Sequence, residues 1–348
     1  MKSWLIDCVD QHYDCRNEST GWYIPTRLID VGSSLTPPRL RAASDVSVGE
    51  RYATLSYCWG MKSFHRLRSS NYAAMHQKIP LDDLPRTFRD AIVVTRMLDV
   101  RYLWVDSLCI IQDSQEDWQK EASQMGFVYQ NAYFTIAAAA ATDAFDGLFQ
   151  RSDPCVQQLA WPKTSVQVFR HRNHLRHDKE PSASMLAHLP LLRRAWVFQE
   201  MVLSTRTVMF SSEQIYWECR TLSACEDFPN GYCGSKLDRL PPKPLIRSLI
   251  ATSARLLDQT ISWRTWTKLV MEYSRCLLTY QSDRLIAIAG VAQAAHRAVD
   301  SDYLAGLWKR HLSAGLLWYV APNEVKRGGT GLQYVAPSWS WASATGPV

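Results

Sequence analysis

The sequence predicts an α/β protein, in which a parallel sheet flanked by helices is followed by a mainly helical C-terminal region. Short apolar segments typical of buried strands alternate with segments of helical periodicity over residues 51–225. Beyond residue 243 the pattern is mostly helical. The length of 348 residues exceeds what one hydrophobic core usually organises. We therefore expect an N-terminal arm over residues 1–50, an α/β domain over 51–225 and a helical extension over 226–348.

The α/β domain is expected to begin with a strand, a helix and a second strand. Tyr52–Tyr57 is a short apolar run that leads into a loop at Gly60, as a buried strand would. Residues 85–98 place their apolar side chains on one helical stripe. Tyr102–Ser107 is again apolar, apart from the single carboxylate of Asp106. This order predicts two neighbouring parallel strands in the centre of the sheet.

The remaining segments continue the alternation. Ser114 is a good N-cap for a helix that reaches Val128. The residues before 51 carry turn and extended signals without a sustained helical period, and residues 150–190 are polar and rich in proline. The other expected elements are a third strand at 134–141, a helix at 194–203, a hairpin at 207–219, helices at 263–278 and 282–298, and a last strand at 336–343.

Composition and charge exclude some classes of protein. The net charge of +6 is spread along the chain and does not favour a nucleic acid partner. No segment approaches the roughly 20 apolar residues that a membrane helix needs, and no signal peptide pattern opens the chain. We therefore expect a soluble, cytoplasmic protein.

The cysteines and histidines do not predict a metal site. The chain has nine Cys and no C-x-x-C pair, so the spacing is not that of a zinc ribbon. Cys109 lies in an apolar run, where a free thiol behaves as a small buried side chain in a reducing compartment. His171, His174 and His177 stand among basic residues whose charges oppose cation binding. We expect no metal and no resident cofactor.

Three segments in order carry a family resemblance. They are LSYCWG at 55–60, LWVDSLCIIQ at 103–112 and RAWVFQE at 194–200. Together they resemble the fungal heterokaryon incompatibility (HET) domain family, and later motifs such as PSWSW at 337–341 are similar to its C-terminal continuation. The family triggers cell death when genetically different fungal cells fuse. Its domain is distantly similar to the flavodoxin-like TIR domain, and some TIR domains cleave NAD at the nicotinamide–ribose bond.

The resemblance implies a site at the carboxyl ends of the strands, where open α/β sheets bind ligands. Glu200 stands where TIR NADases carry the glutamate of W-C-x-x-E, which implies a catalytic role for Glu200, with Asp106 beside it. An anion suffices for this chemistry, because nicotinamide leaves as a neutral molecule and the ribosyl cation needs a nearby negative charge. The residues implied to bind NAD, as substrate, are Ser56, Tyr57, Trp59, Gly60, Arg194 and Trp196.

Simpler interpretations stay open. Glu200 can be a helix-surface carboxylate paired with Arg194 or Arg206, and Asp106 can hold a loop. Glu121, three residues after Trp118, is a second candidate for the catalytic carboxylate.

Two other functions compete with NAD cleavage. One is a non-catalytic death-signalling module that self-associates or binds an incompatibility partner protein, and the other is an enzyme recruited from the family for another metabolite. The discriminating observation is whether Ser56, Asp106, Trp196 and Glu200 meet at one open pocket.

Overall fold

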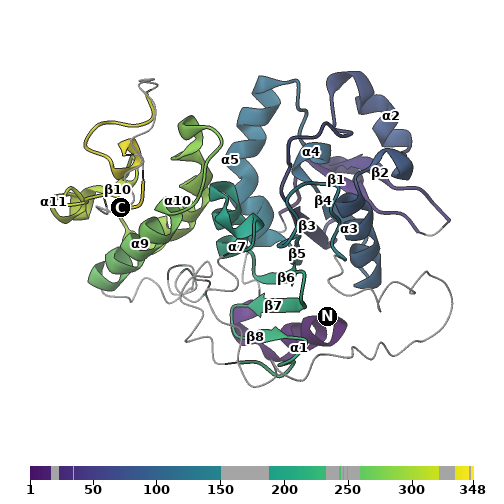
Figure 1. The fold of residues 1–348 in the computed structure, drawn as a ribbon, viewed down its shortest axis with the longest axis horizontal. Coiled ribbons are helices and arrows are strands. Elements are labelled where there is room, and N and C mark those ends of the chain that lie inside the picture. The colour runs from purple at the N-terminus through teal and green to yellow at the C-terminus, as the bar shows by residue number, and fades with distance from the viewer. Residues whose placement is uncertain are drawn as a thin grey trace.

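The structure is a computed structural model, shown in Figure 1. It describes residues 1–16, 23–33, 35–149, 188–232, 259–320, 334–344 and 346–348, together with Lys243, Ile246 and Leu249. The basic segment with His171, His174 and His177, and most of the polar segment at 150–190, lie outside the described residues.

An eight-stranded mixed sheet forms the centre of the described chain, in the order β2-β1-β4-β3-β5-β6-β7-β8. The pairs β3–β4, β3–β5 and β5–β6 are parallel, which confirms the expected central neighbours. The sheet is not wholly parallel, because β1 pairs antiparallel with both β2 and β4 at one edge, and β6, β7 and β8 pair antiparallel at the other. The strands are β1 Arg27–Asp30, β2 Arg39–Ala42, β3 Tyr52–Ser56, β4 Tyr102–Trp104, β5 Phe134–Ala137, β6 Arg206–Phe210, β7 Ile215–Cys219 and β8 Ser223–Cys225.

Helices cover both faces of the sheet. Figure 1 places α3 on one side and α5 on the other, as expected when successive parallel crossovers run in opposite directions from β3. α5 and α7 also pack against α10 of the C-terminal region. The α-helices are α1 Lys2–Gln11, α2 Tyr72–Gln77, α3 Arg86–Met97, α4 Asp106–Cys109, α5 Gln115–Asn131, α7 Ala195–Leu203, α9 Gln259–Ser274, α10 Ile286–Val299 and α11 Leu312–Gly315.

A pair of glycines lets the C-terminal region approach the α/β core closely. A Cβ on Gly126 of α5 would lie 2.7 Å from the Cα of Gly290 in α10, and a Cβ on Gly290 would lie 2.8 Å from the Cα of Gly126. Any larger residue at either position would push the two helices apart. α7 lies beside this crossing, so Glu200 stands on a helix that packs against both α5 and α10.

Some expected elements differ from the structure. The N-terminal segment is not an irregular arm, since it contains α1 and contributes β1 and β2 to the sheet. α1 is short and buries only Trp4, Leu5 and Cys8. Its apolar residues are too few for their spacing to predict a helix. The second expected strand ends at Trp104.

At the other end of the chain the expected strand over 336–343 is also wrong. The 3-10 helix η11 (Trp341–Ser343) is formed there instead, and the indole of Trp341 donates to the carbonyl of Gly306 at 2.9 Å. The strands β9 (Tyr303–Leu304) and β10 (Leu307–Trp308) pair with each other nearby. No helix of the described residues is long and apolar enough to cross a membrane.

Candidate functional site

Two loops meet at the carboxyl ends of β3 and β4. The Tyr57 hydroxyl donates to Asp106 Oδ1 at 2.9 Å, and the Trp59 indole donates to Asp106 Oδ2 at 2.7 Å. The backbone N–H of Ser107 donates to Asp106 Oδ1 at 2.6 Å. Asp106 is the first residue of α4, so its carboxylate satisfies a free N–H of that helix while it holds the loop after β3.

Burial and hydrogen bonding shift the pKa of Asp106 in opposite directions. Burial raises the pKa of Asp106, and the hydrogen bonds from Trp59, Tyr57 and Ser107 oppose that rise. Both carboxylate oxygens are therefore already engaged by donors from the protein. This arrangement fits a carboxylate that positions the two loops.

Glu200 lies on α7 beside this loop pair, and its residue surface is only 7% exposed. Burial raises the pKa of Glu200 to about 7, and the negative charge of Asp106 acts in the same direction. The Ser56 hydroxyl, the Arg194 guanidinium and the Tyr129 hydroxyl oppose the rise. Glu200 therefore exchanges a proton near neutral pH, as a general base or acid must.

Ser56 lies beside Glu200 and acts on its pKa. Ser56 Oγ is buried and forms no well-aligned hydrogen bond with the described residues, although its hydroxyl influences the pKa of Glu200. An unsatisfied buried hydroxyl beside a carboxylate offers a donor and an acceptor to a third group.

A row of hydroxyls fixes α7 against the sheet. The hydroxyl of Thr54 on β3 lies 2.7 Å from that of Thr135 on β5, and Thr135 lies 2.6 Å from the Ser204 hydroxyl. Ser204 donates in turn to the backbone carbonyl of Glu200 at 2.6 Å. This row links two parallel strands to the turn of α7 that carries Glu200, so the position of the glutamate backbone depends on the sheet.

Arg194 precedes α7 and connects it to the loop after β3. Its Nη1 donates to the carbonyl of Tyr57 at 3.4 Å. Burial raises the pKa of the Cys58 thiol, and the neighbouring charge of Arg194 opposes that rise. The guanidinium is half-buried, and its positive charge acts on Glu200.

Two of the expected site residues are not part of this group. The indole of Trp196 donates to Asp283 at 3.2 Å and so faces the C-terminal region. Gly60 has a left-handed backbone with φ of 71°, and a Cβ there would lie 2.3 Å from Cβ of Asp143. Ser56, Tyr57, Trp59, Asp106, Arg194 and Glu200 do come together. Sequence reasoning missed Tyr129, which looks like an ordinary residue of the α5 stripe.

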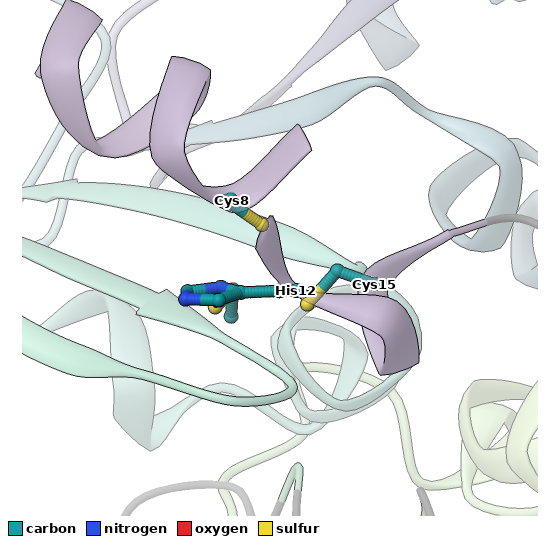
Figure 2. A group of neighbouring side chains, drawn as sticks. Cys8, His12 and Cys15 are labelled. Atoms are coloured by element: carbon teal, nitrogen blue, oxygen red, sulfur yellow. The ribbon is translucent and has the colours of Figure 1, made fainter. Parts of the chain in front are cut away.

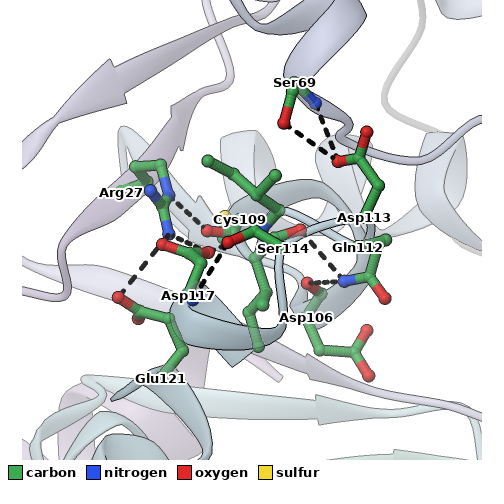
Figure 3. Close-up of polar contacts among 11 residues, drawn as sticks. Arg27, Ser69, Asp106, Cys109, Gln112, Asp113, Ser114, Asp117 and Glu121 are labelled. Carbon is green, nitrogen blue, oxygen red and sulfur yellow. Dashed lines mark hydrogen bonds and ion pairs between the residues drawn. The ribbon is translucent and has the colours of Figure 1, made fainter. Parts of the chain in front are cut away.

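The second carboxylate candidate, Glu121, belongs to a different network (Figure 3). Arg27 Nη2 lies 3.5 Å from Glu121 Oε1 and 2.6 Å from both oxygens of Asp117. Arg27 Nε donates to the carbonyl of Cys109 at 2.6 Å. These contacts tie α5 to β1 and to the end of α4, which is a structural role.

Two cavities among the described residues also lie elsewhere. A cavity of about 550 Å³ is lined by residues of the β1–β2 connection and its surroundings, among them Asp30, Arg39 and Arg101. A second, of about 410 Å³, is lined by residues 48–51 and 99–101. Glu200 borders neither cavity.

A family model matches part of the chain. The family described as heterokaryon incompatibility protein (HET) matches residues 52–200, a segment that begins with β3 and ends at Glu200. The searches found no matching curated protein and no matching solved structure. Residues 52–200 of this chain are therefore similar to the heterokaryon incompatibility family.

Proposed function

We propose that this HET-domain chain is a cell-death effector that cleaves the nicotinamide–ribose bond of NAD, with Glu200 as the catalytic carboxylate. The observation that carries the proposal is the state of Glu200. Its carboxylate is buried, its pKa is raised to about 7, and Ser56, Arg194 and Asp106 surround it. A carboxylate of this kind is common at catalytic sites.

The order of the strands supports this position for a site. The four central parallel strands run β4-β3-β5-β6, which is second, first, third, fourth along the chain. The flavodoxin-like order begins in the same way and binds ligands where the direction of the connections reverses. That switch lies between β3 and β5, where Ser56 pairs with Ala137. This agreement favours the TIR-like fold expected from the sequence.

The chemistry needs little more than a fixed anion. The bond between C1′ of the ribose and the pyridinium nitrogen breaks, and its electron pair stays with the nitrogen of the neutral nicotinamide. Ionised Glu200 stabilises the ribosyl cation and accepts the proton of the water that attacks C1′. The Ser56 hydroxyl beside Glu200 binds a ribose hydroxyl, and Arg194 provides a positive charge for the phosphates.

The site is closed in the present arrangement, so access requires movement. The Trp59 indole donates a hydrogen bond to Asp106, and Cζ of Arg66 lies 5.0 Å from the centroid of the Trp59 ring. We infer that NAD reaches Glu200 after the loop with Trp59 shifts, and we attribute this opening to activation by self-association or by a partner protein.

Nicotinamide release by the purified protein tests the proposal. Wild type, Glu200→Gln and Glu121→Gln are incubated with NAD over a range of protein concentrations, and nicotinamide is separated and quantified. We expect Glu200→Gln to lose at least about 100-fold in rate, because glutamine keeps the shape and removes the charge. Glu121→Gln should keep activity, since Glu121 lies in the Arg27 network.

The pH profile adds a second test of the same assignment. The rate of the wild type should rise as Glu200 ionises, with an apparent pKa near the value of about 7. Equal rates for wild type and Glu200→Gln contradict the assignment, as does a wild type that releases no nicotinamide at any protein concentration.

A non-catalytic death-signalling module is the second candidate function. It is favoured by the 7% exposure of Glu200 and by the donors that occupy both oxygens of Asp106. Cell killing on expression separates the two functions. If Glu200→Gln kills cells as efficiently as wild type while the fold is intact, the signalling module is the better assignment.

A further inference from the structure

Four side chains with metal-binding atoms converge at the edge of the sheet farthest from β2. Cys8 lies near the end of α1, and His12 is the residue directly after this helix. Cys15 is the last residue of the 3-10 helix η1 (Tyr13–Cys15). Cys219 is the last residue of β7. One ligand atom from each of the four lies within 4.8 Å of all the others. Figure 2 shows Cys8, His12 and Cys15 gathered between the end of α1 and the strands beside it.

The separations fit a single tetrahedral ion. With Zn–S bonds of about 2.3 Å and Zn–N bonds of about 2.0 Å, the ligand atoms of a tetrahedral site lie about 3.5–3.8 Å apart. His12 Nδ1 lies 3.3 Å from Cys219 Sγ. The remaining separations, at most 4.8 Å, need only small side-chain rotations to close around an ion.

Hydrogen-bond donors from the protein surround the cysteines of this group. Arg206 is almost fully buried, and its Nε donates to Cys8 Sγ at 3.2 Å, while its Nη2 donates to the carbonyl of Cys15 at 2.8 Å. The backbone N–H of Leu222 donates to Cys219 Sγ at 3.2 Å. Such donors to sulfur orient and stabilise the ligands of zinc sites. The guanidinium also balances the net negative charge of three thiolates and one Zn²⁺.

We propose that Cys8, His12, Cys15 and Cys219 bind one structural Zn²⁺ ion. Three thiolates and one imidazole in a closed tetrahedral set are a common zinc coordination, and this set leaves no open position for catalysis. The ion joins the N-terminal segment to β7, a strand more than 200 residues later in the chain. The ion therefore stabilises the antiparallel edge of the sheet, and this role is independent of the proposed NAD chemistry.

Metal analysis of the full chain tests the proposal directly. Protein purified under reducing conditions without chelators should contain one Zn²⁺ per chain by elemental analysis. Cys8→Ser, Cys15→Ser and Cys219→Ser should each lose that zinc. Cys225→Ser is the matched control, because Cys225 is equally buried on neighbouring β8 and lies outside the group. It should retain one Zn²⁺.

Histidine substitution and cobalt keep the test valid if serine variants fold poorly. His12→Cys should keep zinc by completing a four-cysteine site, whereas His12→Ala should lose it. Replacement of zinc by Co²⁺ should give intense visible bands of a tetrahedral thiolate site in wild type and His12→Cys, and none in His12→Ala. Arg206→Gln should bind zinc about 10–100-fold more weakly.

Three outcomes overturn the assignment. They are folded wild type without bound zinc after incubation with Zn²⁺, a disulfide among Cys8, Cys15 and Cys219 in the purified protein, and zinc that is retained by all three serine variants. The proposed function is tested separately, because Glu200→Gln should contain as much zinc as wild type.

Discussion

Glu200 and Glu121 are buried glutamates on the neighbouring helices α7 and α5, but their partners differ. Glu121 is 2% exposed and lies 3.5 Å from Arg27, which also holds Asp117 through both carboxylate oxygens. Glu200 forms no ion pair with the described residues, and its neighbours are hydroxyls and the more distant charge of Arg194. Burial raises the pKa of both groups, while a cation in contact opposes the rise only for Glu121.

The difference separates a carboxylate that holds the fold from one that is available for chemistry. A buried carboxylate with a fixed cation is costly to disturb, because removing either partner leaves an unpaired charge in the interior. A buried carboxylate without such a cation destabilises the fold whenever it ionises, and proteins keep such groups mainly where they function. Stability measurements on matched variants therefore test the comparison independently of any enzyme assay.

The largest effect is expected at Arg27. Arg27→Met leaves Asp117 and Glu121 without their cation, so the free energy of unfolding should fall by about 3–5 kcal/mol. Urea unfolding followed by tryptophan fluorescence measures this change. Arg89→Met, at an exposed position of α3, is the control and should stay within about 0.5 kcal/mol of wild type. An equal fall in the free energy of unfolding in the two variants would contradict a structural role of the Arg27 network.

The next effect is a pH-dependent gain in Glu200→Gln. The pKa of Glu200 rises from 4.5 to about 7 on folding, so the folded state holds the proton more tightly. Below pH 4.5, Glu200 therefore does not change the stability of the wild type. As pH rises from 4.5 to about 7, the free energy of unfolding falls, and above about pH 7 it is lower by up to about 3 kcal/mol. Glutamine carries no charge, so Glu200→Gln should melt above wild type at about pH 8 and close to it at about pH 5.

Glu121→Gln is the matched control for this pH series. Arg27 favours the ionised form of Glu121, so its replacement should change stability far less between the two pH values. If Glu121→Gln gains as much as Glu200→Gln on going to high pH, the two glutamates do not differ as the structure indicates.

The sequence was sufficient for the central strands and for part of the site. The unit of β3, α3 and β4 was predicted because two apolar runs enclose one amphipathic stripe, and the parallel pairing of β3 with β4 confirms it. The placement of Ser56 and Asp106 at adjacent strand ends follows from the same pattern. Such features depend on short stretches of sequence, where periodicity is informative.

Other features depend on contacts between distant segments. Trp196 was expected at the site, but Asp283 of the C-terminal region holds its indole. The group of Cys8, His12, Cys15 and Cys219 has no C-x-x-C spacing, and its last member is far along the chain, so only the fold brings it together. Likewise β1 is a strand because it pairs with β4, and β2 is a strand because it pairs with β1, a preference that four-residue segments do not reveal.

Asp106 provides the smallest and most specific test, because it is linked to both the loops and Glu200. Asp106→Ala removes the acceptor of the Tyr57 hydroxyl, the Trp59 indole and the Ser107 N–H, which should cost about 2 kcal/mol in urea unfolding. Asp99→Asn is the control, since Asp99 is exposed and asparagine tolerates its φ of 56°. The negative charge of Asp106 also raises the pKa of Glu200. In Asp106→Ala the Glu200-dependent loss of stability should therefore be smaller and end at a lower pH than in wild type. An unchanged size and end point of this loss would show that the two carboxylates are not coupled.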